Sequence, residues 1–527
     1  YSIKYDLTQA LKFDYSGSAI ALVGEPVGEI DRDDDIGYQQ YVETVMTNLM
    51  SAGDITTYNH NVNGSYKLPF DKIPLMNFVT GDIRYQSSFR WDRAPFAQDT
   101  LGATIQNSRN LSLNGQANFL KLYNRVPYLK KINNERPKKA SDRNVGNERR
   151  DGFGNVEDEE EKQKIEIHPL KHILRFMMGV QNISGSFTRN EGILLPGYAE
   201  SSNYGGFAND FQAPGILFLV GHQNTDIFGN RTSTDFAYDQ AAMNGWLVQQ
   251  PYLNQQYSET FTESFNVRLN IEPIKHFKIE LTANRSNSRN NQSFFRYDEV
   301  SEDWVHESPS ENGNFSATVM SWPTAFLNDD DNFSSDIWTN LLVNRLEISS
   351  RLNDINYNID DPNPTGYYQG WGPTSQDVTI PAFMSAYLGL NPSDVSLDVT
   401  KVPVAPNWRI SYDGLSKIPS LKKKFRRFNL SHTYRSTMST SYTTNLSYTE
   451  DGAGLPTATD NGTYSNFISQ RQFNTVSITE QLSPLIGLDM TLKTASQNEP
   501  QIKVELTRDR NVSFGLANYQ ITETKSK

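Results

Sequence analysis

The chain has 527 residues, of which 37% are hydrophobic and 12% aromatic, and its formal net charge at pH 7 is -12. This acidic balance argues against a nucleic-acid-binding protein, which needs a basic surface. The absence of cysteine excludes disulfides, thiolate metal sites and cysteine nucleophiles. No run of about 18 apolar residues occurs, so a transmembrane helix is excluded and any membrane crossing has to use closed strands.

Alternation of apolar and polar residues recurs along the chain and predicts amphipathic strands. In the first half the alternating runs are Tyr58–Leu68, Phe78–Trp91, Leu111–Tyr123 and Phe176–Phe187. In the second half they are Trp408–Tyr412, Phe428–Thr437, Val476–Leu482, Leu488–Leu492, Ile502–Thr507 and Val512–Ala517. Helical spacing occurs only in short pieces, at Tyr38–Met50 and Ile380–Leu390. The sequence therefore predicts an all-β protein with short helices in its loops.

The clearest pair of strands lies in residues 261–285. Two apolar series at every second residue flank a short polar turn, Glu272–His276, whose proline cannot donate to a strand ladder. We expect an antiparallel hairpin with one apolar and one polar face. The candidate lipid-facing residues are Phe265, Val267, Leu269, Ile279 and Leu281. The candidate lumen-facing residues are Arg268, Asn270, Lys278, Glu280 and Asn284.

Such a hairpin fits either a soluble β-sandwich or an outer-membrane barrel, and the loop lengths favour the barrel. Tight turns contrast with long polar connections, and outer-membrane barrels pair short turns on one side with long loops on the other. The long loops are expected at Gly24–Gly53 (with a short helix), Asn190–Ser258, Val300–Phe333 and Asp354–Pro406. The 26 tyrosines and 28 phenylalanines also suit membrane interfaces.

One insertion, Lys130–Lys164, differs from the other connections because it contains almost no apolar residue and ends in an acidic run. It cannot bury a core, so we expect it to be mobile. It is either a solvated linker between strands or a docking arm for a partner, and the linker is the more favoured interpretation.

No local motif predicts catalysis, a cofactor or a metal. His168 and His172 are four residues apart, but Pro169 interrupts a helix that would align them. Two acidic clusters lack the spacing of an EF-hand and read as solvated loop tips. They are Asp31, Asp33, Asp34 and Asp35, and Asp329, Asp330 and Asp331. Neither a nucleophile elbow nor a phosphate-binding glycine loop is present, so we expect no enzyme.

Several long segments resemble the SprA/Sov family, the very large outer-membrane translocon of the type IX secretion system, in its C-terminal portion. Examples are MMGVQNISGSFTRNEGILLPGY (Met177–Tyr198), ANDFQAPGILFLVG (Ala208–Gly221) and LSPLIGLDMTLK (Leu482–Lys493). Further matching segments are Asp99–Lys131, the hairpin continued to Arg296, Ala405–Lys417, Leu430–Ser439 and Val512–Glu523. The segments occur in order over most of the chain.

The resemblance implies that residues 1–527 are part of one very large transmembrane barrel in the outer membrane, with the alternating polar faces toward the lumen. It implies passage of folded cargo proteins to the cell surface and a role in gliding motility. It also implies partners: secreted cargo proteins, a smaller outer-membrane barrel (PorV-like), a periplasmic plug protein, a periplasmic prolyl isomerase and outer-membrane lipid. The long loops would cap the pore or hold the partner barrel.

Two departures and three alternatives accompany this resemblance. The insertion at Lys130–Lys164 is shorter than the family's, and the end near Lys527 lacks an aromatic-ended closing strand, so the chain reads as a fragment.

Another outer-membrane transporter, for nutrient uptake or lipopolysaccharide insertion, would show similar alternation. A surface adhesin of soluble β-sandwiches would bury its apolar faces against one another. A catalytic barrel is the weakest alternative.

Overall fold

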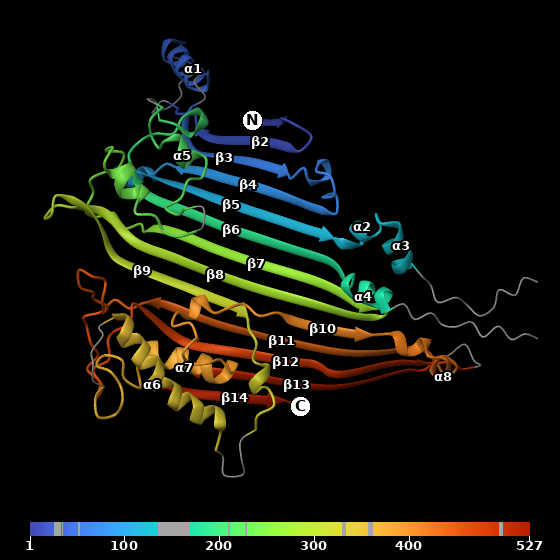
Figure 1. The fold of residues 1–527 in the computed structure, drawn as a ribbon. Helices are drawn as coiled ribbons and strands as arrows, with labels where there is room; N and C mark the ends of the chain where they lie inside the picture. Colours follow the sequence, from blue (N-terminus) through green and yellow to red (C-terminus); the bar gives the residue numbers. More distant parts are fainter. Residues whose placement is uncertain are drawn as a thin grey trace, which may run out of the picture.

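A computed structural model describes residues 1–25, 33, 35–50, 53–134, 169–208, 211–226, 229–328, 334–356, 362–494 and 499–526. Its described residues form one antiparallel sheet of fourteen strands, which confirms the predicted all-β class (Figure 1). The strands are β1 Ser2–Asp6, β2 Leu11–Leu22, β3 Asp54–Lys67, β4 Val79–Asp92, β5 Ala103–Asn118, β6 Val180–Tyr198, β7 Tyr257–Ile274, β8 Phe277–Asp298, β9 Asp303–Thr318, β10 Asn407–Tyr412, β11 Phe425–Thr444, β12 Arg471–Leu492, β13 Gln501–Gly515 and β14 Gln520–Ser526.

Helices occupy the connections between the strands. They are α1 Asp35–Met50, α2 Phe119–Tyr123, α3 Pro127–Asn134, α4 Pro169–Met177, α5 Ile216–Leu219, α6 Asp336–Asn356, α7 Gln376–Leu388 and α8 Pro419–Lys422. One π-helical turn, η4 Phe236–Ala242, and six 3-10 turns complete the described connections: η1 Phe70–Lys72, η2 Phe96–Leu101, η3 Tyr204–Gly206, η5 Trp322–Thr324, η6 Val399–Lys401 and η7 Gly414–Lys417. None of the helices in the described ranges is long and apolar enough to span a membrane.

Strands that follow one another in the chain lie side by side, with one exception. β9 and β10 share a single position between β8 and β11. β9 pairs with residues 285–298 of β8, and β10 pairs with residues 277–282, so together they form one interrupted strand. The chain leaves the sheet after Thr318 and returns at Asn407.

The register separates the sheet into two chemically different faces. In the β7–β8 hairpin, Leu269 lies opposite Leu281 and Asn270 opposite Glu280. Paired residues project to the same side and neighbours along a strand to opposite sides. We call the side of Leu269 and Leu281 the apolar face and the side of Asn270 and Glu280 the polar face.

Two folded segments pack on one end of the apolar face. We call residues 199–256 the first lobe and residues 319–406 the second lobe, and we call this end of the sheet, where β7 begins, the loop end. Phe218 and Phe236 of the first lobe share a core with Tyr58, Phe89 and other sheet residues. The second lobe packs helix α7, which is buried from Val378 to Leu388, against β9 and β11–β13. Figure 1 shows α6 and α7 lying over the strands from β11 to β14.

A row of paired residues shows that both lobes lie on the apolar face. Phe265, Arg285, Ala317, Met438, Ile478 and Val512 are successive partners across β7, β8, β9, β11, β12 and β13. The last four belong to the core of the second lobe. Tyr257, on the same side of β7 as Phe265, belongs to the core of the first lobe.

Several predicted boundaries were wrong. The expected loop Val300–Phe333 contains β9, whose Pro309, Gly313 and few apolar residues hide its alternation. The expected loop Asn190–Ser258 begins inside β6, which continues to Tyr198, and ends inside β7. The expected loop Asp354–Pro406 contains α7, which agrees with the helical spacing predicted at Ile380–Leu390, whereas the long helix α6 before it was missed.

Further corrections concern strand ends. The run Leu111–Tyr123 is a strand only to Asn118, where the asparagine side chain caps α2, and the run Phe176–Phe187 begins in α4. The helix expected in Gly24–Gly53 is α1. Most of the insertion Lys130–Lys164 lies outside the described residues, and only α3 at its start is described.

Candidate functional surface

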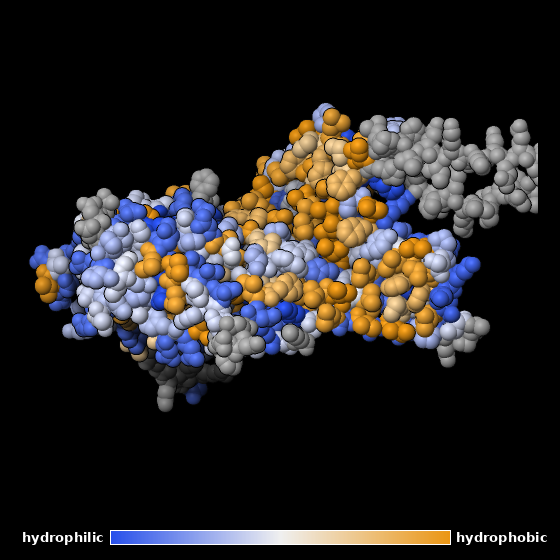
Figure 2. Space-filling model, turned by 60° about the horizontal axis from the view of Figure 1, so that its bottom comes forward, coloured by the Kyte–Doolittle hydropathy of each residue, from blue (hydrophilic) through white to orange (hydrophobic). Residues whose placement is uncertain are grey.

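The half of the apolar face away from the lobes forms an exposed apolar band. Its residues on β4–β8 are Ile83, Leu111, Leu113, Ile183, Phe187, Phe265, Val267, Leu269, Ile279 and Leu281. On β10–β13 they are Ile410, Leu430, Leu488, Met490, Ile502, Val504 and Leu506. Phe265 is 42% exposed, and Val504 and Leu506 are both 53% exposed. Figure 2 shows apolar surface gathered over the part of the molecule away from the lobes.

The apolar band is comparable in extent to the apolar belt of a membrane barrel, although shorter. On β7 it continues from Phe265 through Ile271, six residue steps or about 20 Å along the strand at ~3.4 Å per residue, and a strand tilt of about 35–45° converts this to roughly 15 Å across a membrane. Outer-membrane barrels carry an apolar belt about 25 Å tall. Monomeric soluble proteins rarely leave a contiguous apolar patch of this size uncovered.

Aromatic side chains cluster at both margins of the band. At the end away from the lobes, ring centroids lie 6.2 Å apart in the pair Phe277–Tyr412 and 5.1 Å apart in the pair Phe425–Phe428. At the loop-end margin, Trp322 lies 5.5 Å from Trp408 and 5.5 Å from Tyr434, and Trp408 stacks on Tyr434 at 4.3 Å. Paired aromatic girdles are typical of barrels in the outer membrane.

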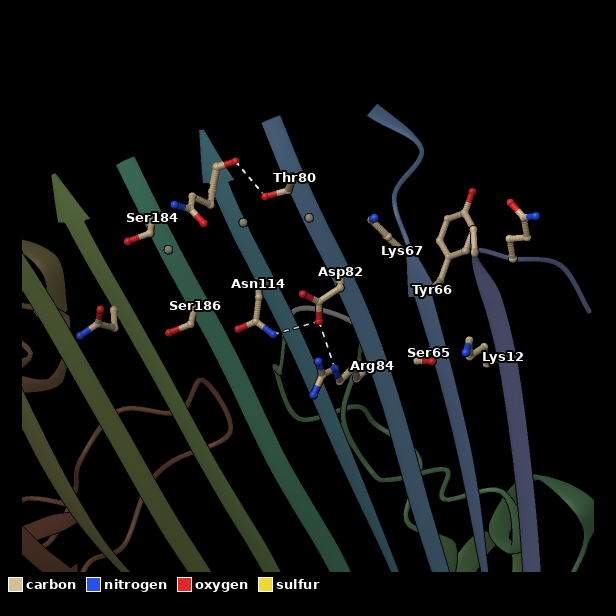
Figure 3. A pocket seen from close by; sticks show the side chains of 17 residues that line it. Lys12, Ser65, Tyr66, Lys67, Thr80, Asp82, Arg84, Asn114, Ser184 and Ser186 are labelled. Atoms are coloured by element: carbon tan, nitrogen blue, oxygen red, sulfur yellow. Dashed lines mark hydrogen bonds and ion pairs between the residues drawn. The ribbon is translucent and has the colours of Figure 1, made fainter. Parts of the chain in front are cut away.

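The polar face carries mostly hydrophilic side chains, and it is hollowed over β2–β7 close to the ends of β2–β6 that point away from the lobes. This hollow has a volume of about 820 Å³. Its lining includes Lys12, Ser65, Thr80, Asp82, Arg84, Asn114, Ser184 and Asn266. Figure 3 shows Asp82 accepting from Asn114 at 3.1 Å and pairing with Arg84 at 3.1 Å, while the loops lie behind the strands.

Several charges on the polar face are paired with neighbours. Arg268 pairs with Glu280 at 2.9 Å, and Lys503 pairs with Glu505 at 2.9 Å. Such solvent-exposed pairs contribute only about 0–1 kcal/mol each to stability. Serine, threonine and asparagine separate these pairs along the polar face.

The structure places the two predicted sets of residues on opposite faces of the same hairpin. Phe265, Val267, Leu269, Ile279 and Leu281 lie on the apolar face, and Arg268, Asn270, Lys278, Glu280 and Asn284 lie on the polar face. Asn284 accepts a hydrogen bond from Asn266 across the strands. Contact with lipid or with a lumen stays a prediction for each of them.

Sequence reasoning missed a set of buried ion pairs at the loop-end margin of the apolar band. Arg109 pairs with Glu191 at 2.5 Å, and Arg189 pairs with Glu263 at 2.7 Å. Buried charges need such partners because an isolated buried charge is very costly. Arginine and glutamate alternate with apolar residues on this face, and this pattern could have indicated buried charges. It does not indicate which residue of another strand pairs with each of them.

A third buried pair joins the sheet to the second lobe. The Arg510 and Glu480 side chains are each 1% exposed and lie 3.2 Å apart. Arg510 also donates to the carbonyl of Thr324 at 2.8 Å and to its hydroxyl at 2.9 Å. The hydroxyl of Ser321 donates to Glu480. This network holds the first turn of the second lobe where the chain leaves the sheet.

Ser293, His306 and Asp235 form a hydrogen-bonded chain under the first lobe. Ser293 Oγ lies 2.6 Å from His306 Nδ1, and His306 Nε2 lies 2.8 Å from Asp235 Oδ2. Burial alone would raise the pKa of Asp235, but the hydrogen bond and charge of His306 outweigh it and hold that pKa below its usual value. Asp235 also caps η4, and Ser293 is 4% exposed. The chain therefore connects the first lobe to β8 and β9.

The candidate metal residues lie mostly outside the described part of the chain. His168, Asp31, Asp34, Asp329, Asp330 and Asp331 are outside it, and the side chains of His172 and Asp35 are not described. Within the described ranges, no group of three or more histidine, aspartate or glutamate side chains is arranged to hold a metal ion.

Comparison with known proteins gives structural matches only. No protein-family model and no curated protein matches the chain. Solved structures that match include the copper transporter OprC (6% identity, TM-score 0.24), CdiB from Acinetobacter baumannii (7%, 0.15) and P. aeruginosa FpvA bound to heterologous pyoverdines (9%, 0.16). These alignments cover 95%, 97% and 97% of this chain. The chain spans 53%, 58% and 57% of the length of those structures.

Proposed function

We propose that this chain forms a section of the wall of an outer-membrane transport barrel. The observation that carries the proposal is the exposed apolar band between two aromatic margins, backed by a polar face of the same strands. A strand wall with lipid on one side and water on the other needs this arrangement. A β-sandwich adhesin would instead cover the apolar band with a second sheet.

Closure of the wall follows from the same physics. β1 and β14 each have a single strand neighbour among the described residues. In hydrocarbon, every unpaired backbone group costs several kcal/mol, so a sheet in a membrane has its edges paired. The proposal therefore requires strand partners for β1 and β14 in the assembled barrel.

We propose more specifically that the barrel is the protein-conducting translocon of the type IX secretion system, as the resemblance to the SprA/Sov family implies. The polar face would line the conduit. A wall of short polar side chains and paired charges offers a passing folded protein few strong attachment points, so it suits cargo of varied sequence. The wall would act as a passage without catalysis, and the energy for transport would come from outside this chain.

The position of the lobes bears on the partners that the resemblance implies. Both lobes pack on the apolar face, so they would lie outside the conduit and would not cap it from this section of wall. Their exposed surfaces are then the places available to a smaller partner barrel in the same membrane. The plug protein and the prolyl isomerase would act from the periplasmic side.

The test is quantitative proteomics of culture medium and periplasm in cells that make the intact protein or lack it. Cargo proteins should disappear from the medium and accumulate in the periplasm of the deficient cells, and gliding should be lost. An unchanged set of secreted proteins with impaired nutrient uptake or lipopolysaccharide assembly would reject the protein-conducting role. Such a result would still be compatible with the chain forming part of the wall of a membrane barrel.

A further inference from the structure

We propose that Arg508 and the turn Trp322–Leu327 bind the phosphate of an anionic phospholipid headgroup, one without a compensating positive charge, at the loop-end margin of the apolar band. This inference rests on the proposed membrane position of the wall. It adds a lipid-binding site that the transport role does not require.

Arg508 lies where the apolar band ends. It pairs with Leu482 on β12, and Leu506, on the same side two residues earlier, belongs to the band. The next residue on this side, Arg510, is enclosed by the second lobe. Arg508 therefore stands between the uncovered and the covered parts of the apolar face.

The guanidinium of Arg508 has donors that the described residues do not satisfy. Its Nε and one terminal nitrogen are buried without a hydrogen-bond partner. Arg109, Arg189 and Arg510, on the same face, each pair with a carboxylate. The Arg508 side chain as a whole is only partly buried, so its accessible part offers an unpaired positive charge that attracts a phosphate.

The turn beside Arg508 presents apolar and aromatic side chains. The Arg508 guanidinium lies 5.0 Å from the ring centroid of Phe326, and Phe326 lies 5.3 Å from Trp322 in an edge-to-face arrangement. Phe326 is 42% exposed and Leu327 is 40% exposed. Aromatic rings with a neighbouring cation are characteristic of the depth at which lipid headgroups meet acyl chains.

A second positive group lies next to this turn. The ammonium of Lys525 lies 3.4 Å from the carbonyl of Leu327 and pairs with Glu523 at 3.2 Å. Glu523 also lies 3.9 Å from Arg510, so its charge is shared between two cations. The acyl chains of the same lipid would continue over Leu506 and Val504. The headgroup phosphate would thus lie beside Arg508, and the acyl chains would lie along the adjoining part of the apolar band.

The experiment uses the intact protein, made cysteine-free, in nanodiscs of phosphatidylcholine with or without phosphatidylglycerol. A bimane dye on Leu327→Cys reports contact with lipids brominated near the headgroup. The dye should be quenched, and brominated phosphatidylglycerol should quench about fivefold more effectively than brominated phosphatidylcholine at equal amounts. Arg508→Gln should remove this preference, whereas the matched variant Arg409→Gln on the polar face should keep it.

Three results would overturn the proposal in distinguishable ways. Equal quenching by both lipids, unchanged in Arg508→Gln, would reject a headgroup site while leaving the wall in the membrane. Loss of the preference on adding inorganic phosphate alone would show a general phosphate site without lipid selectivity. Absence of quenching at Leu327 and also at Leu281→Cys, in the band, would reject the proposed membrane position itself.

Discussion

Replacing Arg510 by methionine should loosen the second lobe from the sheet. The substitution leaves the Glu480 carboxylate, which is 1% exposed, without its cation, and it removes the donors to the Thr324 carbonyl and hydroxyl. Breaking a buried pair by removing one partner costs about 3 to 5 kcal/mol. The double variant Arg510→Met with Glu480→Leu should recover a large part of this cost, because no buried charge is then left unpaired.

Hydrogen exchange of the membrane-embedded protein measures this effect by region. A loss of about 3 to 5 kcal/mol corresponds to exchange that is faster by roughly two to four orders of magnitude in α7, whereas η4 in the first lobe should not change. Uniform acceleration of both lobes would show that Arg510 stabilises the sheet as a whole. No acceleration in α7, or a double variant as damaged as the single one, would refute the role assigned to the pair.

Two further predictions concern the second lobe and its surroundings. Burial raises the pKa of Asp377 to about 6, although the hydroxyl of Ser469 donates a hydrogen bond to its carboxylate at 2.6 Å. The folded lobe therefore binds the proton of Asp377 more tightly than the unfolded chain does. As a result, the stability of the lobe should fall as the pH rises from about 4 to 6. Because Asp377 is only partly buried, we expect Asp377→Asn to raise the free energy of unfolding of the lobe by about 1 to 2 kcal/mol at pH 7. Limited proteolysis between pH 4 and 8 should then show a flatter pH dependence than in the unaltered protein. An unchanged pH profile would count against the role of this carboxylate. Gly370 has φ +80°, and a Cβ there would lie 2.0 Å from the Phe467 ring. Gly370→Ala should therefore lower the free energy of unfolding of the lobe by about 2 kcal/mol or more. The control Gly452→Ala, where a Cβ would meet open space, should leave stability unchanged in the same assay. Equal effects of the two alanines would contradict the contact with Phe467.

The faces of the sheet could be predicted from the sequence, because a period of two in apolar residues is sufficient to assign them. Phe265 and Arg268 were placed on opposite faces by counting alone, and the pairing of Leu269 with Leu281 agrees. The prediction extends along each strand as long as no bulge shifts the register. This local rule explains why the all-β class was accessible without a structure.

The lobes could not be predicted, because their positions depend on contacts between distant segments. α6 carries apolar residues on more than one side, so no single periodic face marked it, and α7 is buried on all sides from Val378 to Leu388. β9 and β10 share one strand position only because an 88-residue segment, residues 319–406, leaves the sheet between them. Partners such as Arg510 and Thr324, which are 186 residues apart in the chain, leave no local pattern.

The central claim is that the apolar band contacts lipid while the polar face contacts water, and the absence of cysteine in these 527 residues makes it directly measurable. Spin labels on Leu281→Cys and Thr282→Cys, neighbours in β8, probe the two faces of the membrane-embedded protein at the same depth. The label at position 281 should be relaxed more by oxygen, which dissolves in lipid, and the label at position 282 more by a water-soluble nickel complex. Similar exposure of both labels to the nickel complex, or the reverse order, would contradict the claim.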